Sequence, residues 1–179
     1  MSQPETDDDV PPMPGVECYE AAPIRTREQA VRSDWIDYNG HMNVAYYTLA
    51  FDKASDTVWD EMLGVGEALA KLGRMGPMVV QQQIHYIGEL LEGERFYTEL
   101  QVLDWSEKAI HLFQTMRKVS DDALCATSET LSFNVDLQRR RTAPYPDWAL
   151  SRVRAMGEAH QGLPRPEQAG RTIAIRRRS

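Results

Sequence analysis

The hydrophobic pattern changes its period once along the chain, and this change limits the folds that the chain can adopt. From Val44 to Met62, large apolar residues recur every three or four positions, which predicts an α-helix with one apolar face. From Met75 to Asp136, apolar and polar residues alternate in four runs, as in half-buried β-strands. Because no crossover helices separate these runs, a parallel βαβ array is excluded. The pattern predicts an α+β fold, with a curved antiparallel β-sheet wrapped around one long central helix.

Composition divides the 179 residues into one folded domain and two terminal tails. Residues 1–20 are rich in Pro, Asp and Glu, and they hold too few large apolar groups to offset the entropy of ordering them, so we expect a disordered acidic tail. Residues 161–179 end in a basic run and are expected to be mobile. The domain, residues 21–160, is expected to begin with a strand near Thr26–Arg32 and to end with a helix from Trp148 to His160.

Charge and cysteine content exclude several classes of protein. Twenty Lys and Arg against 27 Asp and Glu leave a formal net charge of −7, which argues against nucleic acid or an anionic membrane as a partner. Cys18 and Cys125 cannot form the disulfide framework of a small secreted domain, and the acidic first residues do not resemble a secretory signal. The sequence has no apolar run long enough to span a bilayer. We therefore expect a cytoplasmic protein.

The loop that precedes the predicted helix, D-Y-N-G-H-M-N from Asp37 to Asn43, carries the most chemical information. It places a carboxylate just ahead of the helix, with Gly40 allowing a sharp turn and Asn43 suited to cap the helix. Amides in the first turn of a helix carry partial positive charge and can stabilise an oxygen that becomes negative during acyl transfer. Asp, Asn and Gly are also ordinary turn and cap residues, so the pattern alone leaves a purely structural role open.

Three segments of the chain resemble a known enzyme family. The run DWIDYNGHMNVAYYTLAFDKASD, with HYIGELLEGE and RRTAPYP further along, is similar to the hotdog-fold thioesterases of the 4-hydroxybenzoyl-CoA thioesterase superfamily. The form D-x-x-G-H-x-N with an aromatic residue four positions later resembles the acyl-CoA and acyl-carrier-protein branch. The whole span, about residues 25–146, is similar to the betainyl-CoA thioesterases of carnitine breakdown. The resemblance implies an acyl-CoA thioesterase that hydrolyses a thioester to a free acid and CoA.

The same resemblance implies roles for residues of the loop and the helix start. Asp37 would act as a general base on water or as a nucleophile. The backbone N–H of Val44 would polarise the thioester carbonyl, Gly40 would supply the turn, and Tyr47 would pack in the core or along the substrate tunnel. Where some family members have a catalytic acid on the strand after the helix, this chain has three glutamines, residues 81–83. Asp37 is therefore left as the candidate carboxylate.

Other residues could contact the substrate, and each has a structural alternative. His41, and after it Asn43, could take part in catalysis, although a histidine beside a helix start is often only a hydrogen-bonding group. His85 could line the pocket or be a half-buried strand histidine. Aromatic faces near the motif could hold a quaternary ammonium group by cation–π attraction, or could simply belong to the core. These aromatic residues are Trp35, Tyr38, Tyr46, Tyr47 and Trp59.

The expected ligands and partners follow from the same chemistry. We expect no metal and no cofactor other than the CoA of the substrate, because the four histidines lack the spacing of a zinc site. The CoA phosphates would need local positive charge, supplied by Arg139, Arg140 and Arg141 or by Arg117 and Lys118, although these could also be solvated basic stretches.

Open sheet edges favour a homodimer or homotetramer with the pocket between subunits. Two other functions stay open at this point: a hotdog dehydratase that acts on an acyl thioester, and a non-catalytic acyl-CoA-binding protein. The sequence does not identify the acyl group.

Overall fold

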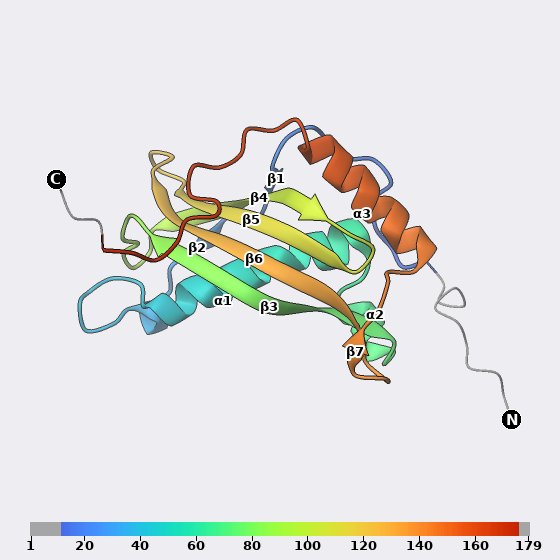
Figure 1. Cartoon of the computed structure of the whole chain (residues 1–179). Coiled ribbons are helices and arrows are strands. Elements are labelled where there is room, and N and C mark those ends of the chain that lie inside the picture. The colour runs from blue at the N-terminus through green and yellow to red at the C-terminus, as the bar shows by residue number, and fades with distance from the viewer. Residues whose placement is uncertain (1–11, 176–179) are drawn as a thin grey trace, which may run out of the picture.

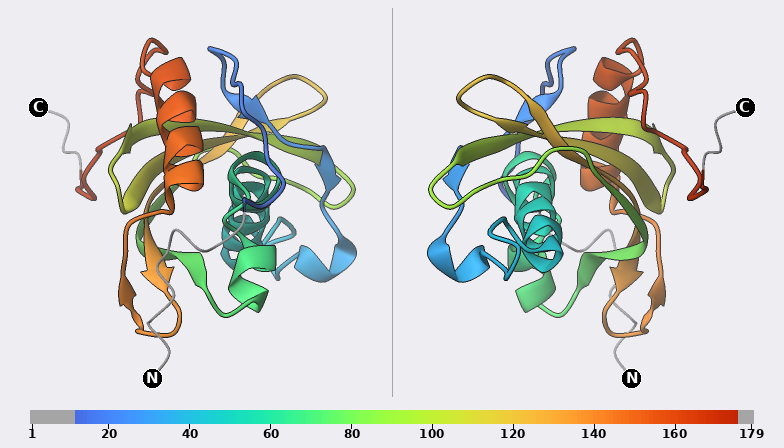
Figure 2. Two further views of the ribbon diagram at one scale, coloured as in Figure 1. Left: turned by 90° about the vertical axis from the view of Figure 1, so that its right-hand side faces the viewer. Right: turned by 90° about the vertical axis from the view of Figure 1, so that its left-hand side faces the viewer.

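The computed structural model describes residues 12–175. Its centre is helix α1 (Val44–Asp56), which lies in the concave face of a curved antiparallel sheet (Figure 1). Figure 2 looks nearly along this helix and shows the sheet arching over it. The predicted α+β architecture is therefore confirmed.

The sheet has the strand order β1-β4-β5-β6-β3, and every pairing is antiparallel. The predicted meander is formed by consecutive neighbours β4, β5 and β6, while β3 crosses over to the far side of β6 and forms one edge of the sheet. Two short strands lie off this path, where β2 pairs with β4 and β7 with β6. The strands are β1 (Ile24–Arg25), β2 (Gln29–Ala30), β3 (Met75–Tyr86), β4 (Arg95–Trp105), β5 (Ala109–Lys118), β6 (Leu124–Asp136) and β7 (Arg141–Thr142).

The segment before α1 differs from the single strand expected there. It follows the edge of β4 as two separate two-residue strands, β1 and β2. The ladder is interrupted over residues 26–28, where the carboxylate of Glu28 pairs with Arg95 at 2.6 Å and with Arg25 at 3.8 Å. Between the two short strands, the hydroxyl of Thr26 accepts a hydrogen bond from the N–H of Thr98 at 3.0 Å, in place of a backbone carbonyl.

The predicted helix keeps its apolar stripe but changes type. The α-helical part ends at Asp56, and the chain continues as a π-helical segment, η3 (Thr57–Leu63), which ends at Gly64 with a φ of 75°. Val58 and Leu63 remain buried in the wider turns. A short helix that the sequence analysis did not predict, α2 (Glu67–Lys71), then leads into β3.

A bulge in β3 changes which side chains face α1. The pairing with β6 shifts between Val79 and Gln81, so Val80 is an extra residue in the strand. The alternation had placed Met78 and Val80 on one face with Ile84 and Tyr86. Because of the bulge, Val79 is instead the residue that contributes to the cavity beside α1.

The predicted C-terminal helix is present as α3 (Asp147–His160), and it packs outside the sheet against β4 and η3 (Figure 2). On the edge of β4, β1 pairs only as far as Leu100, and beyond it the Nδ1 of His160 accepts a hydrogen bond from the N–H of Val102 at 3.0 Å. Gly157 leaves room for the ring of Trp105, which a Cβ at that position would overlap. The helix therefore covers the part of the β4 edge that the short strands leave open.

The buried apolar residues form two clusters along α1. One cluster surrounds the start of the helix and includes Tyr47, Phe51 and Phe96. The other surrounds η3 and includes Leu63 together with Met156 of α3. The first cluster supports the loop that carries Asp37.

Both terminal segments contact the domain within the described residues. The Arg152 side chain, 7% exposed, donates to the carbonyl oxygens of Met13 and Leu63 and pairs with Glu17 at 2.8 Å. After α3, residues 170 and 171 bond to side chains on the outer face of the sheet. The mobility expected for residues 1–20 and 161–179 stays a prediction, and residues 1–11 and 176–179 lie outside the described part.

Two further features of the described residues concern the predicted lack of disulfides and of membrane-spanning helices. Cys18 is exposed and Cys125 is buried, and neither is in a disulfide. None of the helices in residues 12–175 has both the length and the apolar character needed to cross a bilayer.

Candidate active site

The loop between η2 (Ser33–Trp35) and α1 is a tight turn closed by its own backbone. The N–H of Gly40 donates to the carbonyl of Asp37, and the N–H of Asp37 donates to the carbonyl of His41, both at 3.0 Å. Gly40 has a φ of 83°, a left-handed conformation that glycine adopts at little cost. The carboxylate of Asp37 accepts a hydrogen bond from the N–H of Asn39 at 2.8 Å, which holds the side chain against the turn.

The first turn of α1 leaves one amide without an acceptor. The side chain of Asn43 caps the helix, as predicted, by accepting from the N–H of Ala45 at 2.9 Å. The N–H groups of Asn43 and Tyr46 donate to the carbonyls of Trp35 and Asn43. Within residues 12–175, the N–H of Val44 has no such partner. It is available to an external acceptor at the positive end of the helix dipole.

A cavity of about 240 Å³ opens at this helix start. The hydroxyl of Tyr47 donates to the carbonyl of Gly88 at 3.3 Å, and its ring packs edge-on against Tyr86 with 5.3 Å between centroids. Burial raises the pKa of Tyr47 to about 12, so its phenol is neutral at physiological pH. The cavity is lined by His41, Met42, Val44, Tyr47, Tyr86, Ile87, Gly88 and Glu89.

Asp37 lies beside this cavity and is not part of its lining. Its side chain is only 12% exposed, and its Oδ1 is 4.0 Å from the Nδ1 of His41, which does line the cavity. The same imidazole nitrogen is 3.3 Å from the carbonyl oxygen of Met42. The arrangement brings together a proton acceptor, an imidazole and a free N–H donor, which are groups that acyl transfer to water requires.

The five aromatic residues near the motif do not form a single aromatic cage. Trp35 and Tyr46 stack on each other with centroids 5.4 Å apart, and Trp59 is buried in the core cluster around η3. Tyr38 is 96% exposed. Of the five, Tyr47 alone lines the cavity.

Some cavity residues were not identified from the sequence, and one predicted residue lies elsewhere. Tyr86 belongs to the wall, and the strand alternation that places it on the inner face was the available signal. His85, the neighbouring residue in β3, points to the opposite face, where its Nε2 lies 3.1 Å from the amide nitrogen of Gln83. The structure therefore does not bring His85 to the cavity.

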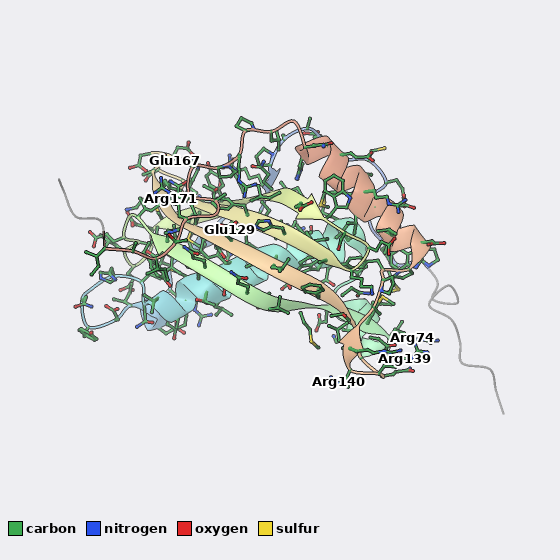
Figure 3. The ribbon with its side chains drawn as sticks, in the orientation of Figure 1. Arg74, Glu129, Arg139, Arg140, Glu167 and Arg171 are labelled. Carbon is green, nitrogen blue, oxygen red and sulfur yellow. The ribbon has the colours of Figure 1, made fainter. Side chains whose placement is uncertain are left out.

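The predicted CoA-binding arginines lie far from this cavity in the same chain. Arg139 and Arg140 are in the turn between β6 and β7, close to Arg74 (Figure 3), and Arg141 begins β7. Strand β3 starts beside this turn, where Met75 pairs with Asp136, and ends at Tyr86 in the cavity wall. At the usual rise per residue, the two ends of β3 are about 35 Å apart.

The second predicted basic cluster lies at the end of the sheet that holds the loop. There, Lys118 pairs with Glu94 at 2.8 Å, and Arg117 pairs with Glu99 and Asp122. Both side chains are thus already engaged with carboxylates. Within residues 12–175, no three His, Cys, Asp or Glu side chains are grouped closely enough to hold a metal ion. The prediction that no cofactor is used remains a prediction.

Comparisons with known proteins agree with this architecture. Residues 31–153 match the family model of the thioesterase-like superfamily. The betainyl-CoA thioesterase of Pseudomonas aeruginosa is 30% identical over 152 residues, which cover 85% of this chain and 95% of that protein. An L-carnitine dehydrogenase/betainyl-CoA thioesterase from a Rhizobium species is 31% identical over 164 residues, which are 92% of this chain but 33% of the relative. The chain thus spans about a third of the length of that relative.

A hypothetical Staphylococcus aureus protein, solved in complex with CoA, superposes with a TM-score of 0.74 at 26% identity. The match covers 84% of this chain and 94% of that one. Together with the strand order around α1, these matches confirm the predicted hotdog fold. The chain belongs to the thioesterase-like superfamily.

Proposed function

We propose that this protein is an acyl-CoA thioesterase that hydrolyses its substrate at the start of α1. The observation that carries the proposal is the unpartnered N–H of Val44, a residue that lines the same cavity as His41, with the Asp37 carboxylate 4.0 Å from the His41 ring. Two observations support an acyl-CoA as the substrate. The relatives are named as betainyl-CoA thioesterases, alone or joined to a dehydrogenase, and the structural neighbour was solved in complex with CoA.

In the proposed reaction, the thioester carbonyl oxygen accepts a hydrogen bond from the N–H of Val44, which stabilises the negative charge that grows on it. Water attacks the carbonyl carbon and gives its proton to Asp37, directly or through His41. The carbon–sulfur bond then breaks, the thiolate takes up the proton, and free acid and CoA leave. Because Asp37 lies behind His41 and outside the cavity lining, the geometry favours a general base over a nucleophile.

The acyl group that we propose is betainyl, by analogy with the relatives of that name. We also propose a homodimer joined along β3, the exposed edge of the sheet. A twofold antiparallel pairing of two β3 strands would place the arginine turn of one subunit near the cavity of the other. That arrangement would reconcile the CoA-binding role of Arg139, Arg140 and Arg141 with their distance from Asp37 in one chain.

The test is the variant Asp37→Asn, assayed by release of free CoA thiol from a panel of acyl-CoA esters that includes betainyl-CoA. Removing the base should lower kcat by roughly 100-fold or more. Asp34→Asn is the matched control, because Asp34 lies in the same region but pairs with Arg32 at 2.9 Å. A wild-type protein that releases no thiol from any ester, or an Asp37→Asn variant as active as the control, would reject the proposal. A dehydratase would modify the acyl group without releasing thiol.

A further inference from the structure

A second cavity, of about 360 Å³, lies along the next face of α1, between the helix and strands β3, β5 and β6. Val44 lines the first cavity and its neighbour Ala45 lines the second, so the two cavities flank the same helix start. The second cavity is lined by Ala45, Thr48, Leu49, Asp52, Ser55, Val79, Gln82, Gln114 and Thr130. We call it the Asp52 cavity.

Five of the nine residues that line the Asp52 cavity have hydroxyl or amide side chains, although most of the lining surface is apolar. Asp52, which is exposed, is the one charged residue in the lining. The nearest basic residue in the sequence, Lys53, is paired with Asp56 at 3.3 Å and does not line the cavity. The lining therefore carries a net negative charge, which attracts a cation and repels a carboxylate.

A buried acceptor behind the lining of the same cavity has no donor. Gln114 is 1% exposed, and its Nε2 donates to the hydroxyl of Ser55 at 3.1 Å, which in turn donates to the carbonyl of Phe51. Its Oε1 has no hydrogen-bond partner among the described residues. This oxygen is itself buried behind the lining, so it adds partial negative charge near the cavity without contacting a ligand there.

The helix geometry connects this cavity with the proposed reaction centre. Val44, Thr48 and Asp52 are spaced by four residues, so they follow a row that turns by about 40° at each step, from the face of the first cavity to that of the second. The Cα atoms of Val44 and Asp52 are about 12 Å apart at the helical rise, and side chains lean toward the helix start, which brings the carboxylate closer to the carbonyl position. An acyl group whose carbonyl lies at the N–H of Val44 can extend along this row toward Asp52.

We propose that the Asp52 cavity binds the acyl group of a cationic acyl-CoA, such as one with a quaternary ammonium, and that Asp52 is the residue that selects its charge. This inference rests on the proposed thioesterase function. The aromatic residues near the motif do not bind the cation in this proposal, because none of them lines the Asp52 cavity. The cation is recognised by the carboxylate of Asp52, and not by an aromatic cage.

Two esters of matched shape separate charge from size. Betainyl-CoA carries a trimethylammonium group, and 3,3-dimethylbutyryl-CoA carries the neutral tert-butyl group of nearly the same volume. The wild-type protein should prefer the cationic ester in kcat/KM. In Asp52→Asn, which keeps the shape of the side chain, this preference should fall about tenfold or more. Asp56→Asn removes the same charge from the same helix outside the cavity, and it should keep the wild-type preference.

The same preference is also measured as a ratio of dissociation constants for the two intact esters, with Asp37→Asn as the background that prevents turnover. An unchanged ratio in the double variant with Asp52→Asn, or a wild-type preference for the neutral ester, would overturn the inference. If the wild-type protein releases no thiol from any ester, the thioesterase proposal fails by itself. The ratio of the two dissociation constants would still show whether Asp52 selects the cationic ester over the neutral one.

Discussion

Gly40 is the residue on which the shape of the catalytic loop most depends. Its φ of 83° lets the chain reverse between Asp37 and His41, so that the carboxylate and the imidazole end up 4.0 Å apart. Space is not the constraint, because a Cβ at this position would meet no atom within 4 Å. The constraint is the left-handed backbone, which costs other residues about 1–2 kcal/mol.

We therefore expect Gly40→Ala to lower the free energy of unfolding by about 1 kcal/mol, measured by urea denaturation. Gly162→Ala is the control, since Gly162 is also in open space but does not have a positive φ. Equal stability of the two variants would show that the loop relaxes into another backbone conformation.

Among single residues, the sequence predicted those interactions that join residues close together in the chain. The cap by Asn43 and the proximity of Asp37 and His41 involve residues within a few positions of each other, so motif spacing could predict them. The unpartnered N–H of Val44 was expected from resemblance. The distance of Arg139 from the cavity was not foreseen, because it depends on the register of β6 against β3 over their whole length.

Among the elements, α3 protects the sheet through a buried histidine. His160 is 2% exposed, and its Nδ1 accepts from the N–H of Val102 at the uncovered part of the β4 edge. Burial lowers the pKa of His160 from its usual value of 6.5, and the carbonyl of Ala22 opposes this shift in part. The folded protein therefore holds the imidazole in its neutral form.

This shift has a defined sign in the pH dependence of stability. Below pH 6.5 the unfolded chain takes up a proton at His160 before the folded chain does, so the free energy of unfolding should fall as the pH drops toward the folded pKa. His160→Asn, which keeps an acceptor for Val102, should reduce this slope. NMR titration of the His160 ring gives the direct measurement, and a pKa at or above 6.5 would contradict the prediction.

The elements show where periodicity succeeds and where it fails. It predicted α1, the meander and α3, because each has an apolar face that repeats over ten or more residues. It missed the change from α-helix to π-helix after Asp56 and the bulge at Val80, since each regular period was continued without an extra residue, and in the strand that residue moves the preceding side chains to the opposite face. The bulge affects the cavities, because it selects Val79 for the Asp52 cavity.

For the whole molecule, the edge formed by β3 is the surface with the strongest case for self-association. Met78, Val79 and Val80 are 37%, 53% and 58% exposed, and they lie on a strand that is paired only with β6. Exposed apolar edge strands are prone to pair with another chain. Dimerisation along this edge was expected from the open sheet, and it stays a prediction.

Val80→Lys should shift the protein from dimer to monomer in analytical ultracentrifugation, because a charge at the centre of the edge is costly to bury between two strands. Thiol release should fall with it if the CoA site is shared between subunits. Leu72→Lys places the same charge at a residue that is 59% exposed but outside β3, and it should leave the sedimentation unchanged. A wild-type monomer, or a Val80→Lys dimer, would refute the assignment of this edge.

The anchoring of Met13 beside Leu63 by Arg152 determines where any preceding polypeptide would be attached. That point lies near the α3 end of the molecule, whereas the loop of Asp37 is at the other end of α1 (Figure 1). A fluorescent reporter or a second catalytic unit tethered upstream would therefore start away from the Asp37 loop of its own subunit. In the proposed β3 dimer, the same end of one subunit faces the cavity of the other, so a bulky fusion at this terminus would come near the entry of CoA esters in the partner.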